Sequence, residues 1–189
     1  MSSELKTNKI SPATGTTTTL GDSGDTFDIP SGATLDVTGA TVSGLSAGKI
    51  LQYVTTEGYS GAITVDNNTT PASAGSTFLV SITPSATSSK ILIQFGSGYG
   101  GADANTYAGL GKIYRQIASG GYSSINTESL ININTQATHV MPWGSSYTDS
   151  PSTTSQVDYQ LYVYTAGNNL VRFAADDYFR FIRAWEIGA

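Results

Sequence analysis

Apolar residues in this sequence recur at every second position within short runs, and small turn-forming residues separate one run from the next. The clearest run spans residues 157–163, where one face is formed by Val157, Tyr159, Leu161 and Val163. The even-numbered positions Gln160, Tyr162 and Tyr164 form an amphipathic second face. A period of two sends alternate side chains to opposite faces of a β-strand. The pattern therefore predicts strands rather than helices.

The composition agrees with an all-β protein of low charge. The residues that favour strands (Val, Ile, Thr, Tyr, Phe and Trp) number 68, whereas the good helix formers number 50. Ser, Thr and Gly together make up 71 of the 189 residues, and charged residues only 12%. An apolar content of 39% is still enough for a folded core. We expect a folded β-protein whose surface is covered mainly by hydroxyl groups.

Several function classes are disfavoured by what the sequence lacks. Nine basic residues and a net charge of -5 argue against nucleic-acid binding. The absence of cysteine excludes disulfides and thiolate chemistry, and the single histidine, His139, excludes a multi-histidine metal centre. No apolar run approaches the roughly 20 residues of a membrane span, and the first ten residues lack a secretory signal. We expect no cofactor, no membrane partner and assembly in the cytoplasm of the producing cell.

The composition of the chain changes near residue 48. Residues 1–48 hold no Tyr or Trp and one Phe, whereas residues 49–189 hold all 11 Tyr and both Trp. We predict that residues 1–48 form a slender β-stalk in which several chains are wound together. Residues 49–189 are predicted to form a compact head.

The stalk prediction depends on regularly spaced apolar residues. Phe27 and Leu35 are eight residues apart, as are Ile29 and Val37. The positions predicted to be buried on assembly are Leu20, Phe27, Ile29, Leu35, Val37 and Val42. Strands this short bury too little surface alone, so we expect them to stack within or between chains. A flexible linker rich in Gly, Ser and Thr is the alternative.

Residues 49–189 contain roughly nine or ten predicted strands and no helix, which predicts a jelly-roll-like β-sandwich. In the last run, residues 178–187, large apolar residues stand at the odd-numbered positions Phe179, Phe181, Trp185 and Ile187. A strand this apolar should lie in the middle of a sheet rather than at its edge. Residues 77–82 and 90–95 are apolar on both parities, so we expect burial on both faces, against a second sheet and another subunit.

The sequence offers little for catalysis. His139 stands alone on a predicted strand, outside the strand–turn–helix context of a nucleophile elbow. The carboxylates considered for glycoside hydrolysis are Asp149, Asp158, Asp176 and Asp177. We predict that the chain is not an enzyme and has no catalytic residues. A polysaccharide-degrading protein is the alternative.

An acidic repeat precedes the first apolar pair. Asp22, Asp25 and Asp28 recur every three residues in a loop with two glycines. Oxygen-rich loops bind calcium, but this spacing departs from the EF-hand pattern and the distal glutamate is missing. Turns in which an Asp side chain caps the backbone explain the residues equally well. We expect no metal site, and both interpretations stay open at this point.

Ligand binding is easier to support than catalysis. Two Gly-rich polar segments place aromatic rings beside amide, hydroxyl and carboxylate groups. The candidate receptor-binding residues in these segments are Tyr99, Asp103, Trp143 and Tyr147. Exposed aromatic rings in such settings stack on sugar faces or anchor protein interfaces. The alternative is that Trp143 and Tyr147 pack over the end of the sandwich or into a subunit contact.

Two groups of segments form recognisable motifs. In the N-terminal part they are SELKTNKISP (residues 3–12), LGDSGDT (20–26) and IPSGATLDVTG (29–39). In the C-terminal part they are SITPSATSSKILI (81–93), YTDSPSTT (147–154) and EIGA (186–189). Both groups resemble segments of virion fibre proteins of tailed phages, particularly those of marine and cyanobacterial phages.

The resemblance implies a homotrimer with a thin β-stalk and a compact head, carried on the virion, without cofactor or enzymatic residues. It implies that residues 1–48 trimerise and attach the protein to the virion. The expected partners are other copies of the chain, tail, portal or capsid proteins, and a host cell-surface glycan. The sequence is shorter than that of a usual fibre and has one stalk-like segment. The leading hypothesis is a short fibre or appendage that attaches the virion to its host. A capsid decoration protein that stabilises the shell is the alternative.

Overall fold

The computed structural model divides into two compact units, Met1–Leu45 and Ser46–Ala189, which we call the N-terminal unit and the head. The residues that the structure describes are 7–37, 49–59, 61–102, 108–134, 139–167 and 170–188. Within these ranges, no helix has the length and apolar character needed to cross a membrane.

Residues 7–37 of the N-terminal unit contain no strand. Two turns are closed by backbone hydrogen bonds, from Asp25 N–H to the Asp22 carbonyl (3.0 Å) and from Ala33 N–H to the Pro30 carbonyl (3.0 Å). The short strands predicted here are therefore absent from these residues of the single chain, because runs of three residues find no neighbouring strand to pair with. An intertwined stalk of several chains stays a prediction.

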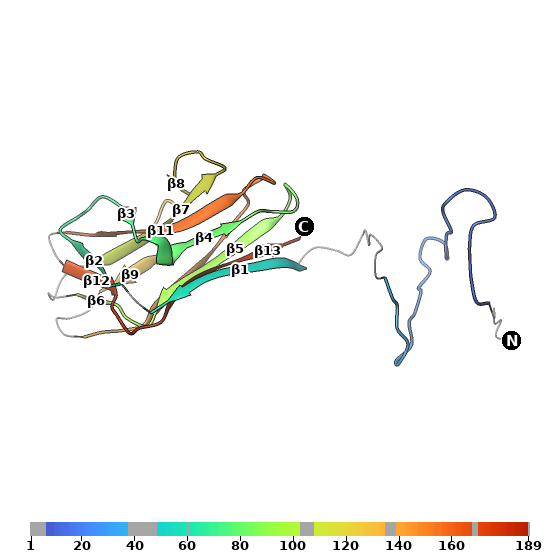
Figure 1. Cartoon of the computed structure of the whole chain (residues 1–189), viewed down its shortest axis with the longest axis horizontal. Helices are drawn as coiled ribbons and strands as arrows, with labels where there is room; N and C mark the ends of the chain where they lie inside the picture. The colour runs from blue at the N-terminus through green and yellow to red at the C-terminus, as the bar shows by residue number, and fades with distance from the viewer. Residues whose placement is uncertain are drawn as a thin grey trace. The chain divides into compact units, whose positions relative to one another are not determined.

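The head is built almost entirely from antiparallel strands (Figure 1). Its first sheet has the order β1-β13-β5-β10 and is formed by β1 (Ile50–Gly58), β13 (Arg180–Ile187), β5 (Lys90–Ser97) and β10 (Trp143–Asp149). In the second sheet, β11 pairs along its length with β7, and shorter strands pair with the other edges of these two. These strands are β11 (Val157–Thr165), β7 (Gly109–Ile117), β3 (Ala72–Ser73), β4 (Leu79–Ile82), β8 (Ser123–Ser124) and β9 (Ile131–Ile133).

A small third sheet adds to the two main ones. It has the order β2-β12-β6 and is formed by β2 (Ile63–Asp66), β12 (Leu170–Ala174) and β6 (Gly101–Ala102). A single 3₁₀ turn, η1 (Ser76–Phe78), leads directly into β4. The third sheet contributes Val65, Val171 and Phe173 to the apolar core, so it is packed as part of the same domain.

The strand order of the two main sheets is that of a jelly roll. The principal strands in chain order are β1, β4, β5, β7, β9, β10, β11 and β13. One sheet holds the first, eighth, third and sixth of these strands, and the other holds the second, seventh, fourth and fifth. The chain thus crosses repeatedly between the sheets, as two Greek keys do. The predicted all-β sandwich is confirmed.

The apolar core lies between the two main sheets. The predicted apolar face of β11 is confirmed, since all four of its odd-numbered side chains from 157 to 163 are buried. From the other sheet, Ile91, Ile93 and Phe95 of β5 are buried as well. Leu92, on the opposite face of β5, is only half-buried. Within one chain, burial of β5 is therefore complete on the core face and partial on the outer face.

The C-terminal strand β13 lies between β1 and β5, so the prediction of a central strand is confirmed. Its core face, however, is the even parity: Ile182, Ala184 and Glu186 are buried. Phe181 and Trp185 lie on the outer face and are half-buried. The positions of the apolar residues alone would place the odd-numbered side chains of this strand in the core. The even-numbered side chains face the core instead, because Glu186 among them is hydrogen-bonded within the head.

Glu186 is a fully buried carboxylate that joins three segments of the head. Its Oε1 atom accepts hydrogen bonds from the Ser85 N–H and hydroxyl, both at 2.6 Å, and from the Ser89 hydroxyl at 2.7 Å. Its Oε2 atom accepts one from the Gln52 amide at 2.7 Å. Burial by itself would raise the pKa of Glu186, but these hydrogen bonds outweigh it and lower the pKa to about 2.

The lowered pKa of Glu186 predicts a specific loss of stability in acid. The free energy of unfolding should fall as the pH drops from about 4.5, the ordinary value, through about 2, because the unfolded chain takes up a proton before the native state does. The full effect of this residue is about 3 kcal/mol. Denaturant titrations at several pH values measure it, and Glu186→Gln should flatten the dependence in this window. An unchanged pH dependence in that variant would contradict the prediction.

Candidate functional site

Trp143, a predicted receptor-binding residue, lies on the inner side of β10 and is half-buried. Its Nε1–H lies within hydrogen-bond distance of two backbone carbonyls, that of Tyr99 at 2.9 Å and that of Phe173 at 2.8 Å. Its ring stacks on Phe78, with the centroids 5.6 Å apart. Because its polar atom and its ring are engaged within the head, the arrangement favours the packing alternative for Trp143.

Tyr99 and Asp103 belong to the other predicted loop. Tyr99 is half-buried, and its ring lies 5.0 Å from that of Tyr178 in a tilted arrangement. Its carbonyl is one of the acceptors of the Trp143 indole, so the loop is joined to β10. Asp103 lies outside the described residues.

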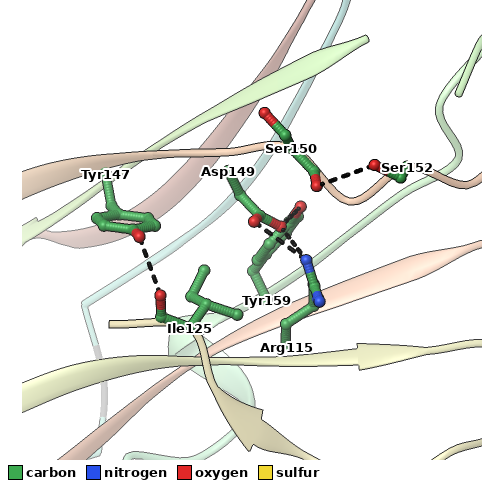
Figure 2. Close-up of polar contacts among 7 residues, drawn as sticks. All are labelled: Arg115, Ile125, Tyr147, Asp149, Ser150, Ser152 and Tyr159. Carbon is green, nitrogen blue, oxygen red and sulfur yellow. Dashed lines mark hydrogen bonds and ion pairs between the residues drawn. The ribbon is translucent and has the colours of Figure 1, made fainter. Parts of the chain in front are cut away.

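Tyr147 also lies on the inner side of β10. Its hydroxyl donates a hydrogen bond to the Ile125 carbonyl at 2.9 Å, as Figure 2 shows. The side chain is half-buried and joins β10 to the segment that follows β8. The structure therefore brings Trp143 and Tyr147 to the same side of one strand, where both make contacts within the head.

Asp149, two residues further on, is a buried carboxylate at the centre of a polar cluster (Figure 2). Its Oδ1 and Oδ2 atoms lie 3.1 and 2.9 Å from Nη1 of Arg115, and Oδ2 accepts a hydrogen bond of 2.8 Å from the Tyr159 hydroxyl. Burial first, and then the charge of Asp149, raise the pKa of Tyr159 far above its usual value. Both carboxylate oxygens are thus used to join β10 to β7 and β11, which argues for a structural role of this acid.

The assembly positions predicted in the N-terminal unit lie at its surface. Leu20, Phe27 and Leu35 are exposed by 58, 67 and 63%. Ile29 and Val37 are exposed as well, and Val42 lies outside the described residues. Five large apolar side chains on a segment without strands are therefore left in water by the single chain.

The acidic repeat forms a capped turn in its first half. The Asp25 carboxylate accepts a hydrogen bond from the Asp22 N–H at 2.8 Å, across the turn that the Asp25 N–H closes. This is the arrangement expected of an Asp side chain that caps the backbone. Within the part of the chain that the structure describes, no group of three His, Cys, Asp or Glu side chains is placed to hold a metal ion.

A cluster of tyrosines on the outer face of the second sheet was not selected from the sequence. Tyr162 of β11 stacks on Tyr114 of β7, with the ring centroids 4.0 Å apart and the planes at 22°. Tyr122, in the turn between β7 and β8, lies 6.0 Å from Tyr162. All three are half-buried, so part of each ring reaches solvent. We call Tyr114, Tyr122 and Tyr162 the tyrosine surface.

Polar groups flank the tyrosine surface. Asp158 of β11 and Gln116 of β7 are paired in register and lie on the same face of the sheet as Tyr114 and Tyr162. Lys112 is the register partner of Tyr162 on the same face. Flat rings beside a carboxylate, an amide and an ammonium group can stack on a sugar ring and donate and accept hydrogen bonds to its hydroxyls.

The hydroxyls of Tyr122 and Tyr162 remain protonated at physiological pH. Burial first, and then the Asp158 carboxylate, raise the pKa of Tyr122. Burial, followed by the neighbouring Tyr114, also raises the pKa of Tyr162. Each neutral hydroxyl can both donate and accept a hydrogen bond. The signal in the sequence was the amphipathic parity of residues 160–164, but nothing in the sequence placed it beside Tyr114.

The comparisons with known proteins assign no family. No protein-family model and no curated protein matches the sequence. Among solved structures, the chain resembles part of infectious bursal disease virus, Gt strain, with 11% identity over 75% of this chain and a TM-score of 0.33. The Gx strain of the same virus gives 9% identity over 76% of the chain and a TM-score of 0.25. The match covers 40% of each of those chains, and at these scores neither likeness assigns a fold or a function.

The contacts of Trp143 and Tyr162 predict a large loss of stability on truncation of Trp143 and a small one on truncation of Tyr162. Trp143→Ala should lower the free energy of unfolding by roughly 3–5 kcal/mol, because it leaves a cavity among core aromatic rings. Tyr162→Ala should cost no more than about 1.5 kcal/mol, since it mainly removes a ring stack at the surface. Urea denaturation measures both. Equal losses would contradict the assignment of Trp143 to packing and of Tyr162 to the surface.

Proposed function

We propose that this chain is a structural protein of a virion, a homotrimeric short fibre or appendage that attaches to a glycan on the host surface. The observation that carries the proposal is the contrast between the two units. The N-terminal unit leaves five regularly spaced apolar side chains exposed, whereas the head closes around a continuous core. Association of several N-terminal units would remove that apolar surface from water.

The head suits this role. Jelly rolls are found in viral capsid and lectin domains, although a fold alone does not define a function. The resemblance of the N-terminal segments to phage fibre proteins supports the same role. We assign the host-binding step to the tyrosine surface, as binding without catalysis, and attachment to other virion proteins to the N-terminal unit.

Three copies would make weak glycan binding effective. Linked sites raise the apparent affinity by roughly 10²–10⁴ over a single site when all can bind at once. A single tyrosine surface therefore needs only modest affinity for a sugar. A low surface charge is compatible with this mode of binding, because stacking and hydroxyl hydrogen bonds carry it rather than ion pairs.

Removing one ring of the tyrosine surface should weaken attachment. We expect Tyr162→Ala to reduce binding of the labelled protein to host cells at least tenfold, because each of three linked sites loses a stacking contact worth about 1 kcal/mol. Flow cytometry with purified host polysaccharide as competitor measures this loss. Tyr59→Ala is the control and should bind normally. It removes an exposed tyrosine that directly follows β1 of the first sheet. Equal binding by both variants would remove the tyrosine surface from the proposal.

A charge in the N-terminal unit should prevent assembly. Leu35→Asp would place an unpaired carboxylate in the buried stalk, at a cost of several kcal/mol per copy. Light scattering of the wild-type protein should give three times 19.7 kDa, and the variant should lose this species. Ser31→Asp, in an exposed turn four residues away, is the matched control. A wild-type monomer, or a trimer unaffected by Leu35→Asp, would contradict the stalk.

The same exposed residues would also suit a protein that clasps capsid subunits. Images of the intact virion separate this capsid-decoration alternative from the appendage. A few copies projecting from the tail or portal support the appendage. A regular array of many copies over the shell supports decoration.

A further inference from the structure

The outer face of the first sheet carries a second group of apolar side chains. Tyr53 of β1 is paired in register with Trp185 of β13, which is paired with Leu92 of β5. The rings of Tyr53 and Trp185 lie 5.2 Å apart. Leu51 and Ile187 extend this row towards the end of the sheet where β1 begins. We call Leu51, Tyr53, Leu92, Trp185 and Ile187 the apolar strip.

The strip is accessible in the single chain. Leu51 and Tyr53 are exposed by 44 and 47%, and the other three members are half-buried. Adjacent exposed apolar side chains of this size mark interaction sites in soluble proteins more often than isolated ones do. The strip also accounts for the apolar residues on both parities of β5, since Leu92 points to this face and away from the core.

Two basic residues lie beside the strip. Lys90, the register partner of Ile187 on β5, is exposed, and its long side chain can keep its ammonium group in water. Arg183, in the next row of the sheet, forms an ion pair of 2.8 Å with Glu57 and lies 4.3 Å from the centroid of the Phe181 ring. Because this guanidinium has its partner on the neighbouring strand, covering the strip would not leave its charge without a partner. An interface here would therefore avoid burying the Arg183 charge without a partner.

The strip begins with the first strand of the head, directly after the N-terminal unit in sequence. This position favours other copies of the chain as its partners. β1 begins at Ile50, so Leu51 and Tyr53 are among the first head residues after the N-terminal unit. In a rotationally symmetric assembly of that unit, covalent linkage holds β1 of every copy near the others. Tethering by short linkers gives effective concentrations of about a millimolar, at which even a small apolar contact forms. Other copies of this chain are therefore the partners present at the highest effective concentration.

We propose that each head binds neighbouring copies of this chain through the apolar strip, with the strips of the copies packed against one another around the symmetry axis. The inference rests on the proposed homotrimer and adds the head contact to it. The strip and the tyrosine surface lie on the outer faces of different sheets. Self-association through the strip therefore leaves the tyrosine surface free for a ligand.

Cross-linking of the full chain tests the contact directly, because the sequence contains no cysteine. Tyr53→Cys introduces a single thiol in the strip, and Tyr59→Cys introduces one just beyond the other end of β1, at a residue exposed by 61%. With a short bis-maleimide at low protein concentration, Tyr53→Cys should give a covalent dimer on a denaturing gel. Tyr59→Cys should remain monomeric on the gel. Equal cross-linking of both, or none of Tyr53→Cys, would overturn the proposal.

A charge substitution gives an independent readout. Tyr53→Glu should raise the concentration at which the trimer dissociates at least tenfold in light-scattering dilution series, whereas Tyr59→Glu should leave it unchanged. Circular dichroism identifies a variant that fails to fold, in which case the cross-linking result decides. A wild-type trimer that Tyr53→Glu leaves intact overturns the strip contact but not the homotrimer. A wild-type monomer overturns the homotrimer and, with it, the inference.

Discussion

The head depends on the insertion of its last strand, β13, between β1 and β5. Glu186 near the end of that strand accepts hydrogen bonds from Gln52 and from Ser85 and Ser89, so a single carboxylate joins the start of β1 to the turn that precedes β5. These contacts link residues about a hundred or more positions apart in the chain. A buried carboxylate is tolerated because every hydrogen bond is made with favourable geometry, and the pKa near 2 reflects that balance.

The inward position of Glu186 determines the outer surface of the first sheet. Alternate residues of a strand point to opposite faces, so placing Ile182, Ala184 and Glu186 in the core sends Phe181 and Trp185 outwards. In the second sheet the alternation has a different result. Its apolar side chains, with Tyr159, fill the core, whereas Tyr114 and Tyr162 face outwards. The two sheets therefore offer chemically distinct surfaces, one suited to apolar contact with a protein and one to polar, aromatic contact with a sugar.

Low charge and many hydroxyls fit a protein that works in several copies. In the proposed assembly, the exposed apolar residues of the N-terminal unit gain stability from neighbouring copies, and the tethered heads associate through the apolar strip. The partly buried ion pair of Asp149 with Arg115, joined by Tyr159, links the two main sheets. The proposed assembly thus combines a head that has its own apolar core with an N-terminal unit whose exposed apolar residues neighbouring copies would cover.

From the sequence alone it was possible to derive the all-β class, the apolar face of β11 and the central place of the last strand, because each follows from local periodicity. Which parity of β13 faces the core could not be derived, since it depends on partners for Glu186 that lie far away in sequence. Trp143 and Tyr147 were read as loop aromatics, whereas strand pairing with β5 turns them inwards. The tyrosine surface arises from the register of β7 against β11, and the apolar strip from three strands brought side by side. Periodicity determines that a strand has two different faces, but only long-range pairing decides what each face meets.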